Sequence, residues 1–501
     1  MDILNGLLGA LQPAYLLSAL VGVLAGTLVG VLPGLGPSAT MGMLLPVTLM
    51  LGDPGASIAM LAGVFYGAMY GGSTTAIVAN IPGEVASIPA TYDGFPMAKK
   101  GRAGQALWIA AVGSFLAGTV GLILLTLVGA TLARFALAFT PSAYLALLLF
   151  ALVTVICLTE GSAVKAMGAA AFGMILTSVG VDEVSGGQLR MTFGIPALME
   201  GLELVPIVVG LFGVTEVFMS AESGIKSFHT GKLGKMMPRG DDLKRGFKGI
   251  LRGTALGFPL GLLPGANPAV ASFMAYDLEK RVSKHPEKFG TGVIEGVAAP
   301  EAANNANAQA GFIPLMALGI PTTSSLAILL AAFMMFGLQP GPLLFTGDNA
   351  GMAWAIIGSM YVGNVMLLVL NLPLVGLWAR ISIIPLKYMG PVILAVCIIA
   401  SYSTRNSMFD VWVTIVFGVV GYLMRKGRWP LSPLILGLIV GPMIESRLAQ
   451  TLSLPGGLST MVTTPIPLIM VVLTVGTLVL SVKLKRAIPA QYREEILEEG
   501  S

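Results

Sequence analysis

Long apolar runs make up most of the chain, and short polar or glycine- and proline-rich stretches separate them. Runs of roughly 18 to 25 residues suit α-helices that cross a hydrocarbon core of about 30 Å. This pattern predicts an all-α polytopic membrane protein with about 12 transmembrane helices, together with re-entrant or broken half-helices. The expected segments lie near residues 15–32, 56–80, 106–132, 142–159, 163–180, 201–220, 326–337, 351–378, 389–401, 410–424, 431–443 and 461–482.

Two of the apolar stretches are interrupted by related motifs. Residues 30–37 read GVLPGLGP, and residues 261–268 read GLLPGANP. Proline removes a backbone donor and clashes with the preceding turn, whereas glycine tolerates unusual backbone angles. An isolated break of this kind is often only a kink, but within hydrocarbon it persists only where protein buries it or where it lines a watery cavity. We call these breaks elbow 1 (residues 33–37) and elbow 2 (residues 264–268), and we expect each to begin a half-helix.

The two elbows belong to an internal repeat. Glycines recur every four residues before each elbow, and a constant offset of 231 residues relates the two copies. Further along, Ile81-Pro82 matches Ile320-Pro321 at an offset of 239, so the repeat has slipped by eight residues. Such paired breaks are typical of secondary transporters built from two related halves. We expect a first transmembrane repeat (1–220), a basic linker (221–252), a second transmembrane repeat (253–460), and a terminal transmembrane helix and tail (461–501).

Two polar stretches are expected to be loops. Residues 84–105 contain Asp93-Gly94, a pair that favours a turn. Residues 221–252 carry eight basic and three acidic side chains, which places this linker in the cytoplasm by the positive-inside rule. The segment before elbow 1 contains Asp2 and no basic residue, so the two elbow helices are expected to enter from opposite sides as an inverted repeat. A parallel repeat is the alternative.

Composition excludes several classes of protein. With 55% hydrophobic and only 11% charged residues, and a mean hydropathy of +0.85, the chain is not expected to be soluble or to bind nucleic acid. Its two cysteines lie in apolar runs and its two histidines lie in separate polar stretches, which predicts no metal site. The sequence contains no His-Glu-x-x-His motif and no Ser/His arrangement at membrane depth, so we do not expect an enzyme. A channel is the remaining rival class.

Polar residues at membrane depth are the candidate site. A helix that starts at an elbow presents free N–H groups and a partial positive charge, which suits a carboxylate without any basic side chain. Glu301 and Asn307 are candidates for coupling to Na⁺ or H⁺, although Glu301 is equally compatible with an exposed helix cap. Any single Ser or Thr here is more often bonded to its own helix. The candidate substrate-binding residues are Gly34, Gly36, Ser38, Ser73, Thr74, Thr75, Asn80, Gly265, Asn267, Asn304, Asn305, Thr322, Thr323 and Ser324.

Several motifs resemble one family. They are GVLPGLGP from Gly30, YGAMYGGSTTAI from Tyr66, NIPG from Asn80, DGFPMAKKG from Asp93, LPGANP from Leu263, FGTG from Phe289 and EGVAAPEAANNA from Glu295. Together they resemble the TctA family, the large membrane subunit of tripartite tricarboxylate transporters, over nearly the whole chain.

The resemblance implies a multi-pass carrier of the bacterial inner membrane that imports citrate-like tricarboxylates or related organic acids. Such a carrier is driven by a Na⁺ or H⁺ gradient and needs no other cofactor. The resemblance also implies two partners, a small TctB-like membrane subunit and a periplasmic TctC-like solute-binding protein. A channel or carrier for another small anionic solute is the alternative.

Overall fold

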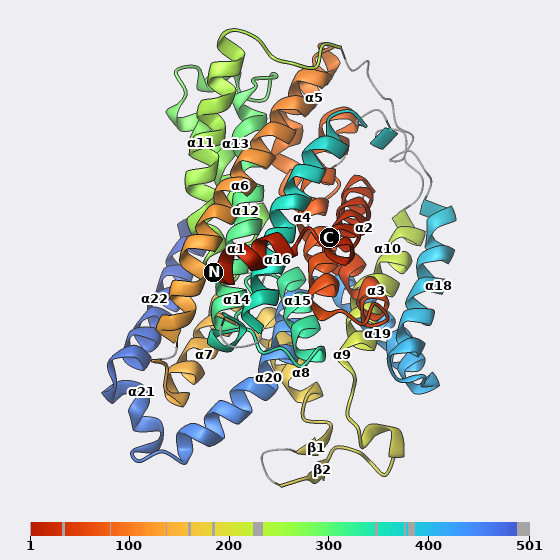
Figure 1. Cartoon of the computed structure of the whole chain (residues 1–501), viewed down its shortest axis with the longest axis vertical. Coiled ribbons are helices and arrows are strands. Elements are labelled where there is room, and N and C mark those ends of the chain that lie inside the picture. The colour runs from red at the N-terminus through yellow and green to blue at the C-terminus, as the bar shows by residue number, and fades with distance from the viewer. Residues whose placement is uncertain are drawn as a thin grey trace.

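Helices make up most of the described chain, as the apolar runs predict (Figure 1). The computed structural model describes residues 2–32, 36–80, 82–136, 138–158, 162–182, 186–223, 234–345, 349–374, 377–378 and 386–487. The chain up to the linker contains α1 (Asp2–Gly9), α2 (Pro13–Val31), α3 (Pro37–Leu49), α4 (Pro54–Ala79), η1 (Val85–Ser87), α5 (Ile88–Lys99), α6 (Ala103–Ala136), α7 (Pro141–Leu158), α8 (Ala163–Leu176), β1 (Gly180–Asp182), β2 (Gln188–Arg190), η2 (Pro196–Leu198), α9 (Leu204–Val208), η3 (Val209–Val214) and α10 (Thr215–Ser223).

The remainder begins at Asp241, so the last part of the predicted linker is helical. It contains α11 (Asp241–Gly261), α12 (Pro268–Val282), η4 (Pro286–Lys288), α13 (Glu295–Ala310), α14 (Phe312–Leu318), α15 (Ser324–Met335), η5 (Pro342–Phe345), α16 (Asn349–Asn371), α18 (Leu386–Arg405), α19 (Met408–Lys426), α20 (Leu431–Leu452), η6 (Gly457–Ser459), α21 (Thr460–Thr463) and α22 (Pro465–Ala487).

Several of these helices have the length and composition of membrane spans. Five described helices pass both criteria, namely α2, the Ala103–Gly129 part of α6, α16, α19 and α20. A sixth span results if Gly457–Thr463 and Pro465–Val479, which are bent by 78°, are taken together. The chain is therefore an all-α, multi-pass membrane protein. The expected number of about 12 spans stays a prediction. Helix α4 is too polar to pass, α13 is both short and polar, and other apolar helices are too short.

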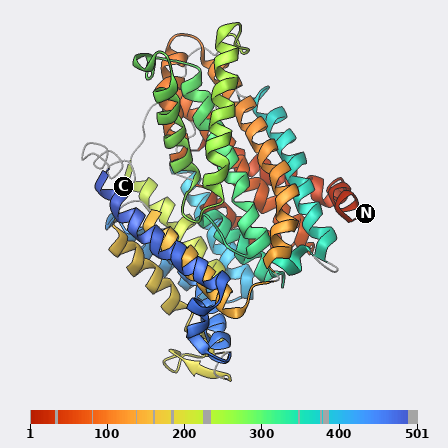
Figure 2. The ribbon, with the colours of Figure 1, turned by 90° about the vertical axis from the view of Figure 1, so that its left-hand side faces the viewer.

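The outer helices carry the apolar surface that contact with lipid requires. Val472, Leu473 and Val479 of α22 are all about half exposed, and α19 exposes Trp412 and Leu423. Figure 2 shows α22 on the side of the molecule opposite α1, which packs against α16. A short antiparallel hairpin of β1 and β2 lies at the end of the molecule opposite the outer ends of α5 and α11 (Figure 1).

The glycine stripe of each half packs in the same way. A Cβ atom added at any of these glycines would lie within 2.4 Å of a backbone oxygen on the facing helix, so only glycine permits this approach. The residues on α13 that supply the facing backbone oxygens are numbered 239 higher than the equivalent residues on α4, which is the offset between the Ile-Pro pairs. The slip of eight residues therefore lies between the elbow and the facing helix. The facing pairs are Gly22–Met60, Gly26–Val64 and Gly30–Ala68 in one half, and Gly253–Ala299, Gly257–Ala303 and Gly261–Asn307 in the other.

The equivalent helices also end alike. Asn80 follows α4 with φ 57°, and Gly319 follows α14 with φ 72°, at the same offset of 239. Both residues are in the left-handed region, which ends a helix and which Asn and Gly tolerate best. Each is followed by an Ile-Pro pair that redirects the chain. The shared geometry shows that the repeat extends beyond the elbows.

The prediction that residues 84–105 form a loop is wrong. This stretch forms η1 and α5, and Asp93-Gly94 lies inside α5 instead of in a turn. Asp93 is completely buried and accepts hydrogen bonds from the backbone N–H groups of Gly290 (3.0 Å), Gly292 (2.7 Å) and Val293 (2.9 Å). The Tyr276 hydroxyl donates a fourth bond at 2.9 Å. These distant donors satisfy the carboxylate and make a buried helix possible.

Candidate functional site

Helix α13 is the polar centre of the molecule. All 16 of its residues are buried, among them Glu301, Asn304, Asn305 and Asn307. The helix is surrounded by α11 and α12 of its own half and by α4, α5 and α6 of the other. Its many alanines allow these helices to come close, so that short polar side chains reach partners on the neighbours.

The start of α3, just after elbow 1, lies in one region with elbow 2. Ser38, in the first turn of α3, shares a hydrogen bond of 2.8 Å with Ser325 at the start of α15. The backbone N–H of Gly265 in elbow 2 donates to the carbonyl oxygen of Thr322 at 3.0 Å. The short segment 322–325 therefore touches both elbow regions. Pro33, Gly34 and Leu35 of elbow 1 lie outside the described residues, and the predicted site residue Gly34 is among them.

The two half-helices start differently. The Asn267 side chain caps α12 by accepting a hydrogen bond from the N–H of Val270 at 3.0 Å. The equivalent position in the first half is Gly36, which gives α3 no side-chain cap. A Cβ atom added at Gly36 would meet no atom of the described residues within 4 Å. The N-terminus of α3 is therefore open, and its partial positive charge is suited to an anion.

Helix α13 connects to elbow 2 through one amide. The Asn307 side chain donates to the carbonyl oxygen of Ala266 at 2.9 Å. Gly265, directly before it, has φ 83°, a conformation that favours glycine. Asn307 thus holds the backbone of elbow 2, and any ion or ligand that moves α13 also acts on this elbow.

A second group of contacts joins α13 to the first half. The Ser73 hydroxyl of α4 donates to Glu301 Oε2 at 2.6 Å. Asn304 Nδ2 donates to Glu84 Oε1 at 3.3 Å, across the interface between the halves. Asn305 Nδ2 donates to Ser114 Oγ of α6 at 2.7 Å and to the carbonyl oxygen of Glu301 at 3.1 Å. Asn305 is therefore held in place on both sides, whereas Glu301 and Asn304 each keep an oxygen without a partner among the described residues.

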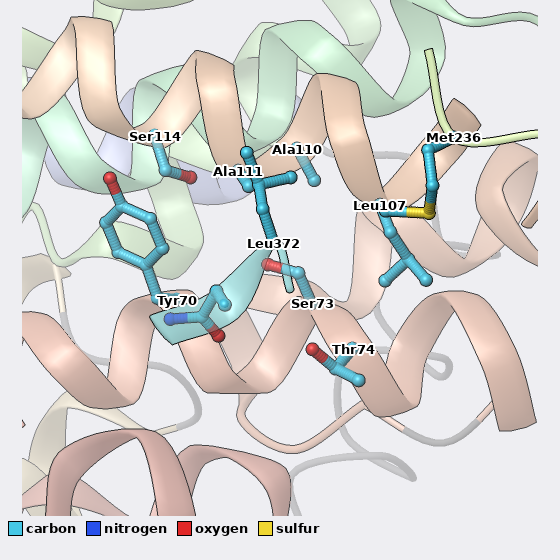
Figure 3. Close-up of a pocket in the computed structure, with 10 residues that line it drawn as sticks. Tyr70, Ser73, Thr74, Leu107, Ala110, Ala111, Ser114, Met236 and Leu372 are labelled. Atoms are coloured by element: carbon cyan, nitrogen blue, oxygen red, sulfur yellow. The ribbon is translucent and has the colours of Figure 1, made fainter. Parts of the chain in front are cut away.

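A small cavity lies beside these contacts. It has a volume of about 20 Å³, room for one water-sized group. Figure 3 shows Tyr70, Ser73 and Thr74 of α4 facing Ser114 of α6, with Met236 at one side. Because Ser73 bonds Glu301 and Ser114 bonds Asn305, the cavity borders the polar face of α13.

Other predicted residues serve the local backbone. Thr75 donates to the carbonyl oxygen of Gly72 in its own helix, and Asn80 is the exposed left-handed cap of α4. Thr323 caps α15 by accepting from the N–H of Leu326. Ser324 shares a hydrogen bond of 2.9 Å with Ser432 of α20.

Sequence reasoning missed several partners in this region. Glu84, Ser87, Ser114 and Ser325 were not among the expected site residues, and Asp93 was placed in a turn. A signal was present for Glu84, because it directly follows the NIPG motif that ends α4. For Ser114 and Ser325 there was none, since each is one hydroxyl in an apolar or hydroxyl-rich stretch.

Broken helices whose polar groups face one another inside a multi-pass helical protein define the class of membrane transporters built from two related halves. The chain matches the Tripartite tricarboxylate transporter TctA family over residues 16–436, and it belongs to that family. The resemblance seen in the motifs is thus confirmed. Members of this family are transporters and not enzymes.

Two proteins of Agrobacterium vitis are similar to this chain. One is an uncharacterized 52.8 kDa protein of the TAR-I ttuC' 3' region, 44% identical over 510 residues that cover 100% of both chains. The other, an uncharacterized protein of the TAR-II ttuC' 3' region, is 46% identical over 209 residues, which are 41% of this chain and 86% of that protein. No solved structure matches the chain.

Proposed function

We propose that this protein is the membrane carrier of a tripartite system that imports a citrate-like tricarboxylate or a related organic acid across the bacterial inner membrane. The observation that carries the proposal is the meeting of the two elbow regions at residues 322–325, directly beside the buried polar helix α13. In hydrocarbon, such an arrangement is stable only if its polar groups have partners in protein, water or a ligand.

The anion would bind at the open N-terminus of α3. Gly36 leaves this end without a side-chain cap, and Ser38 places a hydroxyl next to it. The sequence has no Lys or Arg in residues 30–51, 56–84 or 295–325. Dipoles and hydrogen bonds would then hold the carboxylate, and such a site can release its substrate more readily than one with fixed positive charges.

An inverted arrangement of the halves is part of the proposal, and the directions of the core helices support it. Helix α4 runs parallel to α16, α16 runs antiparallel to α6, and α6 runs parallel to α13. Helices α4 and α13 hold equivalent places in the repeat, so the equivalents run in opposite directions. The pairs that define these directions are Gly55–Met352 and Tyr70–Asn364 for α4 and α16, Thr119–Asn364 and Thr126–Tyr361 for α6 and α16, and Ser114–Asn305 and Gly121–Gln309 for α6 and α13.

The partners and the energy source follow from the family. As a TctA member, the chain would work with a small TctB-like membrane subunit and a periplasmic TctC-like protein that delivers the carboxylate. The driving force would be a gradient of Na⁺ or H⁺, with Glu301 and Asn307 on α13 as the coupling residues. Both residues are buried and lie on the same helix as the contact to elbow 2.

Transport by the reconstituted system tests this proposal. The chain would be incorporated into proteoliposomes with its small subunit and given a panel of carboxylates on the binding protein, under separately imposed Na⁺ and H⁺ gradients. We expect saturable uptake that depends on one of the gradients. Ser359→Ala is the control, because this buried hydroxyl donates to the Ile356 carbonyl oxygen of its own helix at 2.6 Å. Single-channel currents, or flux that ignores both gradients, would contradict a carrier.

A further inference from the structure

Oxygen atoms without partners gather where the first half meets α13. Among the described residues, Glu301 Oε1, Asn304 Oδ1 and Ser87 Oγ are buried and have no hydrogen-bond partner. All three residues are fully buried (0% exposed), so bulk water does not replace the missing partners. Leaving buried acceptors unpaired costs roughly 1–3 kcal/mol each, and more for a charged group. Three such atoms in one place need a physical explanation.

Contacts on the α13 side bring these oxygens together. Glu301 and Asn304 are three residues apart on α13 and therefore share one face of the helix. The Asn304 side chain donates to Glu84 through Nδ2. Its free Oδ1 belongs to the same amide group and therefore lies close to the Glu84 carboxylate. Two carboxyl groups, one from each half, thus flank the amide of Asn304.

The first half completes the group around Gly72. A Cβ atom added at Gly72 would lie 2.5 Å from Ser87 Oγ and 2.8 Å from Glu84 Cγ, so both side chains approach the same point of α4. The next residue, Ser73, donates to Glu301 Oε2. Glycine at position 72 therefore leaves the space into which Glu84 and Ser87 extend. We call Glu84, Ser87, Glu301 and Asn304 the oxygen cluster.

The chemistry of the oxygen cluster suits a small hard cation. Neither Glu84 nor Glu301 forms an ion pair within the described chain. Glu301 is fully buried, and a buried carboxylate without a counter-charge is very unfavourable. A single proton satisfies one oxygen, whereas a cation held by several oxygens satisfies all of them. Among the described residues, no three His, Cys, Asp or Glu side chains are placed so that they could hold a metal ion together, so a monovalent ion fits better than a divalent metal.

We propose that the oxygen cluster binds one sodium ion between the two halves of the protein. The inference deepens the proposed function and rests on it, since it names the coupling ion and adds Glu84, Ser87 and Asn304 to Glu301 as its ligands. Glu84 is only partly buried and gives the ion a way in. Because Asn307 lies one turn beyond Asn304 and holds elbow 2, sodium binding stiffens the helix that also supports the substrate site. Sodium and carboxylate then each raise the affinity for the other.

Direct binding of ²²Na⁺ to the purified full-length chain tests the site without requiring transport. We expect saturable binding that K⁺ and choline do not displace, and a loss of affinity of at least about ten-fold in Glu84→Gln and Glu301→Gln. These variants keep the shape of the side chain and remove its charge. Ser87→Ala should give a smaller loss. Glu295→Gln is the matched control, because Glu295 is a carboxyl on the same helix that lies 3.6 Å from Arg245, outside the oxygen cluster.

The outcomes separate the two proposals. Equal ²²Na⁺ binding by the parent protein, Glu84→Gln and Glu301→Gln, in preparations that elute as folded protein, would overturn the sodium site. Carboxylate uptake driven by a proton gradient in sodium-free buffer would also overturn it, and would leave the proposed function standing. Intact, cluster-dependent sodium binding without uptake of any carboxylate would support the site and contradict the proposed function.

Discussion

Ser38 and Ser325, which are 287 residues apart in the chain, share a hydrogen bond of 2.8 Å that links the start of α3 to the start of α15. Removing one partner leaves the other hydroxyl buried and unpaired, while removing both is nearly neutral. We therefore expect Ser38→Ala and Ser325→Ala each to lower the free energy of unfolding by about 1 kcal/mol. The double variant should lose less than the sum of the two. Thermal unfolding of the four purified proteins checks this, and additive losses would show that the hydroxyls act independently.

The glycine stripes predict severe effects from small changes. At Gly257, the Cβ atom of alanine would lie 2.3 Å from the carbonyl oxygen of Ala303, so α11 and α13 would have to separate. Gly257→Ala should destabilise the protein by about 1–3 kcal/mol, seen as a lower melting temperature in detergent. Gly351→Ala in α16 is the control, because no atom of the described residues lies within 4 Å of its added Cβ. Similar melting temperatures for the two variants would disprove the close packing.

The hydrogen bonds of Asp93 predict a larger loss of stability for Asp93→Ala than for Tyr276→Phe. Asp93→Ala removes the acceptor of four hydrogen bonds and should cost about 3 kcal/mol or more, because three backbone N–H groups lose their partner. Tyr276→Phe removes only one of the four and should cost about 1 kcal/mol. Limited proteolysis near residues 289–293, together with the melting temperature, reports on both. If Tyr276→Phe were the more damaging variant, Asp93 would not be the anchor of this loop.

The neighbouring amides of α13 should behave differently. Asn305 bonds Ser114 across to α6, so Asn305→Ala should lower stability, and Ser114→Ala should reproduce part of that loss. Asn304 has a free oxygen beside Glu84, so Asn304→Ala should abolish uptake and leave the amount of folded protein in the membrane close to normal. Uptake and fluorescence size-exclusion profiles of the three variants distinguish these roles. Normal uptake by Asn304→Ala would remove it from the site.

The inverted repeat predicts opposite accessibility for the starts of the two elbow helices. Single cysteines at Gln12, before α2, and at Lys235, before α11, should react with a membrane-impermeant maleimide from different sides of the membrane. The natural Cys157 and Cys397 are buried and give little background. Labelling of both positions from the same side would exclude the inverted arrangement.

Local sequence signals predicted the elements around the elbows. The Gly-Pro motifs end α2 and α11, and the four-residue glycine spacing lies on the faces that contact α4 and α13. Even the slip of eight residues proved structural, since it relates the facing backbone oxygens as well as the Ile-Pro pairs. These features were accessible because glycine and proline act on the backbone within a few residues.

Features that depend on distant partners could not be predicted. The pair Asp93-Gly94 has the local chemistry of a turn, but donors at residues 290–293 and Tyr276 keep it in a buried helix. Glu84 was assigned to the same polar loop because its partner, Asn304, is 220 residues away. The candidate residues nevertheless included Ser38, Ser73, Asn304 and Asn307, because polar groups at membrane depth require a reason to be there.

The complete enclosure of α13 has a consequence for how the protein is made. A helix this polar has little tendency to leave the translocon for lipid by itself. Of the described helices that pack most closely against it, α4, α5, α6, α11 and α12 come earlier in the chain, and α14 follows. When α13 is synthesised, most of the helices that surround it are therefore already present. It can pack against these helices instead of contacting lipid. Order of synthesis thus substitutes for hydrophobicity in placing the most polar helix at the centre.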